Sequence, residues 1–413
     1  MRTRFPSLRS NTDSRLRGPV ATLAIVCFAQ ALLADRAAAQ DLLVQAQTIV
    51  VAPDTVLTNG KLLVRQGKIA YVGSEIPAEA RAKATVVDYG TATIVPGFVL
   101  ATSTLDQERD LAESSFAFTP DLRAAEAFDP WQEALQKLPA AGVTSVALSP
   151  TARNVAGGIA ALVKPGLKSG QLVSDNLQLV LSLNSAARNQ EREPTSLMGA
   201  KDLLRTTFAT ARTGVQGGPD AAVLRQVLQG GRRVFVYADT FVELSAGLDL
   251  AKEFSFAPVF VGAREAEKVI SRLVQQKAGI VLDTLSPDAR EAQLRLPTLL
   301  AEAGVPFCFG GRPDQLRLSA ALAVHAGLDR KVALQALTRM PAVLLDQQTA
   351  VGSLRQGNAA DFLVFAGDPL DLSTTHLGTW IAGERIVGDA PSPVRATSSV
   401  RTTTATTAPA GGQ

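Results

Sequence analysis

Histidine and cysteine are the residue types that most restrict the chemistry open to this chain. Its 413 residues include two of each, His325, His376, Cys27 and Cys308. Imidazole is the commonest transition-metal ligand and the commonest general base near neutral pH. The counts therefore exclude a site built from three or four imidazoles, a cysteine-ligated zinc site and a disulfide framework.

Carboxylates and hydroxyls are the remaining reactive groups. Six acidic residues follow predicted strands, and in a barrel they would lie near the mouth: Asp106, Glu108, Asp239, Glu265, Asp283 and Asp314. This set is compatible with an oxygen-only Mg²⁺ or Ca²⁺ site, although solvated carboxylates at loop starts are more common. Ser103, Ser149 and Cys308 are potential nucleophiles, but none has a neighbouring histidine or a G-x-S-x-G elbow.

The sequence context of the two histidines does not favour catalysis. His325 lies in a small-residue segment at residues 318–326, which we interpret as a structural helix. His376 lies in a predicted loop between Asp371 and Trp380 and is expected to be exposed to solvent.

Strand and helix signals alternate through the middle of the chain. Short β-branched runs occur at residues 92–99, 143–148, 177–183, 234–237, 258–261, 279–282 and 305–309, with helical stretches between most of them. Such alternation indicates βα units and a largely parallel sheet. Seven or eight strands over this length favour a TIM-like (β/α)₈ barrel, predicted at residues 96–347, over a doubly wound sheet.

The segments on either side of the predicted barrel carry strand signals without helices. Residues 41–95 show short strands with turn signals at Thr58-Asn59-Gly60 and Gln66-Gly67, and Asn-Gly between apolar alternations strongly predicts a hairpin. Residues 348–388 show further strands separated by glycines. The predicted fold class is therefore α/β, with the barrel beside a small composite β-sandwich domain built from both flanks.

Several motifs carry a family resemblance. The C-terminal flank contains G-S-L-x-x-G-x-x-A-D at residues 352–361, and the N-terminal flank contains V-x-x-G-K-I-x-x-V-G at residues 64–73. I-V-P-G-F follows at residues 94–98 and A-G-V-T-S-V at residues 141–146. In this order the motifs resemble the amidohydrolase superfamily, most closely its imidazolonepropionase-like and secreted prolidase-like members. The resemblance implies a composite-domain barrel, hydrolysis of carbon–nitrogen bonds and a zinc centre.

The metal-ligand positions that the resemblance implies hold other residues. The first barrel strand of the superfamily normally ends P-G-F-I-D-x-H-x-H, which aligns Thr102 and Thr104 with the two histidines. Tyr237 aligns with a third histidine position, and Arg312 aligns with the aspartate that serves as metal ligand and proton shuttle. A threonine hydroxyl is a weak neutral ligand, and a guanidinium can neither accept a proton nor bind a cation. We therefore expect no catalytic or metal residues, and no cofactor.

Four other residues are predicted to line a pocket at the barrel mouth. Asp239, Glu265 and Asp283 follow predicted strands, and Asn154 opens a glycine-containing segment at residues 153–164. The segment resembles a hairpin that secreted relatives carry after the second barrel strand. It is interpreted as a turn with an edge strand, or else as a loop that lines the pocket or contacts a partner subunit.

Both chain ends differ in composition from the middle. Residues 1–39 combine arginines, a short apolar run and Ala37-Ala38-Ala39, which predicts a cleaved signal peptide rather than a membrane anchor. This segment carries six arginines and two aspartates, so the formal charge of +3 becomes about −1 without it. The basic character therefore does not indicate nucleic-acid binding. Residues 390–413 are rich in Ser, Thr and Pro and are predicted to form a disordered tail.

These observations predict a periplasmic or secreted protein of amidohydrolase fold that has lost its metal centre. Such a pseudoenzyme would bind a small molecule or act as a partner subunit, in a homo-oligomer or with an active amidohydrolase, and no transmembrane anchor would remain after cleavage. The alternative is an active hydrolase of carbon–nitrogen bonds with an atypical site. A third hypothesis, an envelope protein tethered by its tail, depends only on the C-terminal composition.

Overall fold

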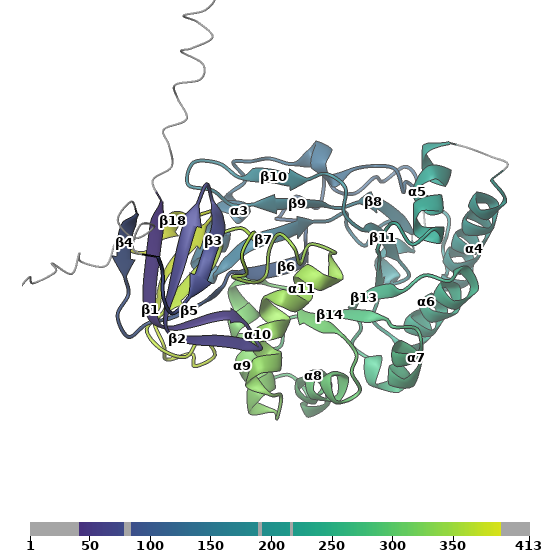
Figure 1. Ribbon diagram of the computed structural model, residues 1–413. Coiled ribbons are helices and arrows are strands. Elements are labelled where there is room, and N and C mark those ends of the chain that lie inside the picture. Colours follow the sequence, from purple (N-terminus) through teal and green to yellow (C-terminus); the bar gives the residue numbers. More distant parts are fainter. Residues whose placement is uncertain (1–40, 78–83, 189–191, 215–217, 390–413) are drawn as a thin grey trace, which may run out of the picture. The chain divides into compact units, whose positions relative to one another are not determined.

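A computed structural model describes residues 41–77, 84–188, 192–214 and 218–389 (Figure 1). The chain divides into two units, Met1–Gln40 and Asp41–Gln413, and all described residues belong to the second. The predicted signal peptide and the predicted tail lie outside the described residues. The boundaries between composite domain and barrel stay a prediction. In the part of the chain that is described, no helix is long and apolar enough to cross a bilayer.

The two flanks of the chain meet in one eight-stranded sheet, which we call the flanking sheet. Its N-terminal strands are β1 (Leu42–Ala52), β2 (Thr55–Arg65), β3 (Lys68–Gly73), β4 (Thr85–Asp88) and β5 (Thr93–Pro96), and its C-terminal strands are β16 (Phe362–Phe365), β17 (His376–Ile381) and β18 (Glu384–Val387). The order is β18-β17-β16-β5-β1-β2-β3, with β4 beside β1. The antiparallel β5–β16 ladder joins the two flanks. Because all eight strands belong to one sheet, the predicted sandwich is not confirmed.

The flanking sheet encloses its own apolar core. Ile69 lies on β3, at one end of the strand order, and Trp380 lies on β17, next to the other end, yet both belong to one buried cluster. Phe362 stacks on Trp380 with ring centroids 5.3 Å apart. The Trp380 indole nitrogen donates to the Tyr89 hydroxyl at 2.9 Å, which satisfies its polar end.

The Asn59-Gly60 turn prediction is wrong. Strand β2 runs through both residues, and the chain reverses instead at Pro53-Asp54, between β1 and β2. Asn59 adopts a left-handed φ of 51° and is skipped in the pairing with β1. A Cβ on Gly60 would lie 2.8 Å from Ile49 Cγ1, so close packing explains this glycine. The predicted Gln66-Gly67 turn is confirmed between β2 and β3.

The middle of the chain supplies two further sheets, a four-stranded one in the order β10-β9-β7-β6 and a six-stranded one in the order β15-β14-β13-β12-β11-β8. Their parallel strands are β6 (Phe98–Ser103), β7 (Val143–Leu148), β11 (Leu179–Ser182), β12 (Val234–Ala238), β13 (Pro258–Gly262), β14 (Gly279–Leu282) and β15 (Phe307–Phe309). The antiparallel strands are β8 (Ala156–Ile159), β9 (Ala161–Lys164) and β10 (Gln171–Ser174). The α/β class is confirmed at this level.

A closed (β/α)₈ barrel is not confirmed. Strand β9 pairs antiparallel with β7, and β8 pairs antiparallel with β11, so residues 156–164 stand between two strands that would otherwise be neighbours. No ladder joins β6 to β15 among the described residues. Helices α10 (Arg330–Leu337) and α11 (Arg339–Leu344) contact both of these strands and cover the place where the ladder would be.

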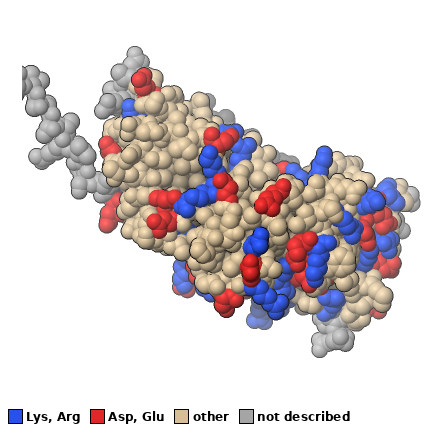
Figure 2. All heavy atoms as spheres, turned by 90° about the horizontal axis from the view of Figure 1, so that it is seen from below, with Lys and Arg blue, Asp and Glu red and all other residues tan. Residues whose placement is uncertain are grey.

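The helices of the described residues are α3 (Glu133–Lys137), α4 (Leu197–Thr213), α5 (Pro219–Leu228), α6 (Phe241–Phe254), α7 (Ile270–Gln275), α8 (Glu291–Glu302), α9 (Leu316–His325), α10 (Arg330–Leu337) and α11 (Arg339–Leu344), with 3₁₀ turns at Ala124–Ala127, Leu138–Ala141, Ser185–Ala187, Ala266–Val269 and Pro313–Gln315. Of these, α4, α6 and α7 lie on the outer side of the six-stranded sheet (Figure 1). Thr240 and Glu243 form a capping box that starts α6 directly after β12. Figure 2 shows charged side chains gathered over the helical side of the molecule.

Along each parallel strand, successive side chains point to opposite faces of the sheet. Those on the inner face, at the carboxyl ends of the strands, line the region that we call the mouth. Val99, Phe235, Val259, Val281 and Cys308 belong to one apolar cluster, and Tyr237 packs against it from the end of β12. A second, larger cluster lies between the strands and the helices. Residues at the carboxyl ends of the strands on the first face therefore point into the mouth.

Candidate functional site

Thr102 and Tyr237 meet at the mouth. Their hydroxyl oxygens are 3.0 Å apart and hydrogen-bonded, although the residues come from β6 and β12, which are not neighbours in either sheet. The pairing of β6 with β7 shifts register between Leu100 and Ser103, next to Thr102. Burial raises the pKa of the Tyr237 phenol, and the negative charge of Asp283 acts in the same direction, whereas the Thr102 bond opposes it. The phenol therefore stays protonated at neutral pH.

The other two residues that align with metal-ligand positions, Thr104 and Arg312, form their contacts away from Thr102 and Tyr237. Thr104 donates to Glu108 Oε1 at 2.6 Å. Arg312 is exposed and its guanidinium lies 2.8 Å from Asp314 Oδ2, while its backbone nitrogen donates to Thr284 Oγ1 at 2.7 Å. Of the four positions, only Thr102 and Tyr237 are in contact with each other.

The donor groups at these positions do not fit a zinc ion. Two hydroxyls satisfy each other, a third is bonded to a carboxylate, and the fourth group is a cation. Among the residues that the structure describes, no group of three or more His, Cys, Asp and Glu side chains could hold a metal ion. No step of a mechanism is therefore derived through zinc.

Asp239 and Asp283 form an acidic pair beside Tyr237. Burial raises the pKa of both carboxyls, the charge of Asp239 raises the pKa of Asp283 further, and Arg264 opposes both shifts. Arg264 Nε lies 3.3 Å from Asp239 Oδ1. Gly262 allows this arrangement, because its φ is 92° and a Cβ there would lie 2.3 Å from Asp239 Oδ1.

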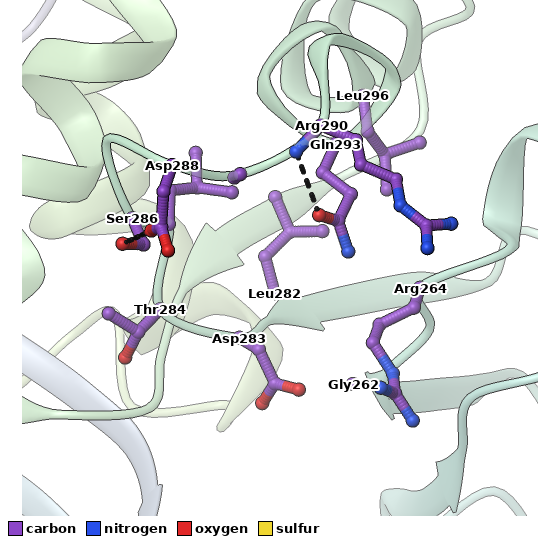
Figure 3. A pocket seen from close by; sticks show the side chains of 12 residues that line it. Gly262, Arg264, Leu282, Asp283, Thr284, Ser286, Asp288, Arg290, Gln293 and Leu296 are labelled. Carbon is purple, nitrogen blue, oxygen red and sulfur yellow. Dashed lines mark hydrogen bonds between the residues drawn. The ribbon is translucent and has the colours of Figure 1, made fainter.

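A cavity of about 540 Å³ opens at the ends of β13 and β14, and we call it the Arg264 cavity (Figure 3). Its lining includes Arg264, Asp283, Thr284, Arg290 and Gln293. Figure 3 shows Asp283 and Arg264 entering from neighbouring strand ends, with Arg290 and Gln293 at the start of α8 facing them. Within the described residues, the Asp283 carboxylate has no hydrogen-bond donor. The sequence analysis missed Arg264 and Arg290, although Arg264 follows the end of β13 by two residues.

Asn154 lines a different cavity, of about 1070 Å³, which we call the Arg192 cavity. Asn154 is buried, and its Nδ2 donates to Thr119 Oγ1 at 3.3 Å. The Arg192 guanidinium donates to Asn154 Oδ1 and to backbone carbonyls that include those of Phe116 and Arg153. Asn154 thus helps to hold the loops that form the cavity wall, and sequence alone gave no signal for Arg192.

Glu265 does not line the Arg264 cavity. Its Oε2 accepts the Phe241 backbone N–H at 2.6 Å, at the first residue of α6, and its Oε1 pairs with Lys268 at 2.7 Å. Its pKa is lowered, first by the Lys268 contact and then by the Phe241 bond. These contacts stabilise the start of a helix.

The prediction that His376 lies in an exposed loop is wrong. His376 begins β17 and is half-buried, its ring lies 5.0 Å from the Phe365 ring, and burial lowers its pKa. His325 ends α9 and is exposed. Neither histidine lines the Arg264 or Arg192 cavity.

Comparison with known proteins finds similarity to amidohydrolases. No protein-family model matches the sequence. A curated protein, amidohydrolase tasK of Hapsidospora irregularis, is 25% identical over 388 residues, which cover 78% of this chain and 39% of that protein. An amidohydrolase structure from Thermotoga maritima MSB8 superposes with a TM-score of 0.75 at 22% identity, covering 84% of this chain and all of that one. The chain therefore shares the fold of amidohydrolase structures and is similar in sequence to a curated amidohydrolase.

The similarity in fold agrees with the order of the sequence motifs. A putative prolidase from Bifidobacterium longum is also similar, with a TM-score of 0.51 at 16% identity, covering 84% of this chain and 94% of that one. The chain spans about two fifths of the length of the curated relative that it matches. At these identities the solved structures show the superfamily's fold and leave the activity of this chain open.

Proposed function

We propose that this protein is a metal-free member of the superfamily that binds a small polar molecule and lacks metal-dependent hydrolase activity. The Thr102–Tyr237 hydrogen bond carries the proposal, because it joins two positions at which the resemblance implies histidine ligands. Neutral hydroxyls are weak zinc ligands, and these two already form a hydrogen bond with each other.

The Arg264 cavity is the proposed binding site. It combines the guanidinium groups of Arg264 and Arg290 with the carboxylate of Asp283 and the side chains of Thr284 and Gln293. A cavity with both signs of charge and neutral hydrogen-bonding groups suits a compact polar ligand better than an apolar one. Its volume, about 540 Å³, is within the range of small-molecule sites.

The proposal also includes export of the protein and its assembly with other subunits. The signal-like residues 1–39 support a periplasmic or secreted protein. A subunit that keeps the fold without the metal could stabilise an active amidohydrolase in a mixed oligomer or could assemble with itself. Co-purification of a histidine-complete homologue from the native host would support the mixed oligomer.

Metal analysis of the purified protein tests the central claim. The protein is incubated with zinc, dialysed and analysed for bound metal, and amide, dipeptide and lactam substrates are assayed in parallel. We expect far less than one zinc per chain and no turnover that a chelator abolishes. One tightly bound zinc per chain, with turnover lost on chelation, would contradict the proposal.

An active hydrolase of carbon–nitrogen bonds is the second candidate. It is favoured by the similarity to a curated amidohydrolase and to a putative prolidase. Turnover that persists in a chelator and disappears in Asp283→Asn would favour this candidate, since it would assign the reaction to the acidic pair.

A further inference from the structure

We infer that the Thr102–Tyr237 bond is a structural replacement for the metal, a brace that holds opposite walls of the mouth together. The resemblance implies a histidine metal ligand at each of these two strand ends. Here the two hydroxyls make the connection directly, with their oxygen atoms 3.0 Å apart. This inference concerns the architecture of the mouth and does not depend on the proposed ligand.

The position of β6 shows why the mouth needs a brace. One edge of β6 pairs with β7, and this ladder shifts register both between Phe98 and Val99 and between Leu100 and Ser103. Its other edge forms no ladder with β15 within the described part of the chain. The carboxyl end of β6 is therefore paired along one edge only, and the Thr102 side chain adds a tertiary contact there.

Tyr237 is suited to the opposite end of the brace. Strand β12 pairs with β11 along one edge and with β13 along the other, so its backbone is fixed on both sides. The Tyr237 ring packs on the apolar cluster inside the strands, which limits its motion. A mostly buried phenol usually retains a hydrogen-bond partner, and Thr102 is only 9% exposed.

A double-mutant cycle tests the brace. Each of Tyr237→Phe and Thr102→Val leaves one mouth hydroxyl without its partner, so we expect each to lower the melting temperature by about 1–3 °C. The double variant should lose clearly less than the sum of the two, because no orphaned hydroxyl remains. Tyr71→Phe and Thr104→Val are matched controls: no hydrogen bond of the Tyr71 hydroxyl is resolved in the described residues, and Thr104 bonds only an exposed carboxylate. Both should melt within about 1 °C of the wild type, because a small change in free energy gives a small change in melting temperature.

Hydrogen exchange separates a brace from a general packing effect. In Tyr237→Phe, the amides at the carboxyl ends of β6 and β12 should exchange several-fold faster, while those of the flanking sheet should keep their wild-type rates. Strictly additive melting shifts, or faster exchange spread evenly over all three sheets, would overturn the inference. If Thr102→Val fails to fold, Thr102→Ala takes its place in the cycle, because it also removes the hydroxyl and adds no bulk.

Discussion

The flanking sheet and the mouth retain the family pattern to different degrees. In the flanking sheet, the signature residues still perform contacts that the fold requires: Asp361 accepts the Ala382 N–H at 2.9 Å and pairs with Lys164 at 2.6 Å. At the mouth, the strands are in place but the aligned residues Thr102 and Tyr237 bond each other. The difference shows that packing positions and chemical positions of one fold can change independently, because a scaffold needs its buried contacts whether or not it holds a metal.

The largest loss of stability is expected from a substitution at a signature residue of the flanking sheet. Lys164 and Asp361 form a buried ion pair, with side chains 8% and 4% exposed, that connects β9 to the start of β16. Asp361→Ala leaves an uncompensated buried charge, so we expect the free energy of unfolding to fall by roughly 3–5 kcal/mol. Urea unfolding measures it.

A paired replacement is the control for the buried charge. Lys164→Met with Asp361→Leu removes both charges and should recover part of the loss, since no buried charge is left and only the Ala382 N–H loses its acceptor. A loss below about 1 kcal/mol in Asp361→Ala would show that the signature aspartate is not a packing residue.

An intermediate effect is expected where backbone conformation shapes the mouth. In Gly262→Ala, the new Cβ needs a left-handed φ and displaces Asp239 from Arg264, so we expect a loss of about 2 kcal/mol. Gly230→Ala is the matched control, because Gly230 has a φ of 73° and no atom within 4 Å of the added Cβ. The control should lose about 1 kcal/mol from backbone strain alone. Equal losses in denaturant unfolding would mean that the Asp239 contact contributes nothing.

The smallest effect is a pH dependence with opposite signs at two acids of the Arg264 cavity. The raised pKa of Asp283 means that the folded state binds its proton more tightly than the unfolded state, so this group costs stability as pH rises above its unfolded value of 3.8. Asp283→Asn should therefore be more stable than the wild type at pH 7, by less than about 1 kcal/mol, and show no advantage below pH 4.

Asp288 provides the opposite case in the same cavity. The Ser286 hydroxyl lowers the pKa of Asp288, so its ionised form adds stability that is present at neutral pH and is lost as pH falls. Asp288→Asn should be slightly less stable than the wild type at pH 7. Melting curves at pH 4, 5.5 and 7 compare the two variants. Shifts of the same sign at pH 7 would show that the cavity does not affect the pKa values of these two acids in opposite directions.

Local patterns predicted much of the fold. The β-branched runs located the parallel strands from β7 to β15, and the flanks were correctly expected to be strands, because side-chain periodicity and branching are properties of a short segment. The Asn59-Gly60 turn failed for a tertiary reason. Ile49 on the neighbouring strand occupies the space where a Cβ would lie, and this demand for glycine looks the same in sequence as a turn.

The sequence by itself determined which residue types, two threonines, a tyrosine and an arginine, stand where the resemblance implies metal ligands. Only the tertiary structure decided that Thr102 meets Tyr237, that Arg264 joins Asp239, and that residues 156–164 stand between β7 and β11. The physical reason is that residue identity and strand propensity are local. Which strand ends face one another depends on register and packing across the whole sheet, and these are fixed only when the core is formed.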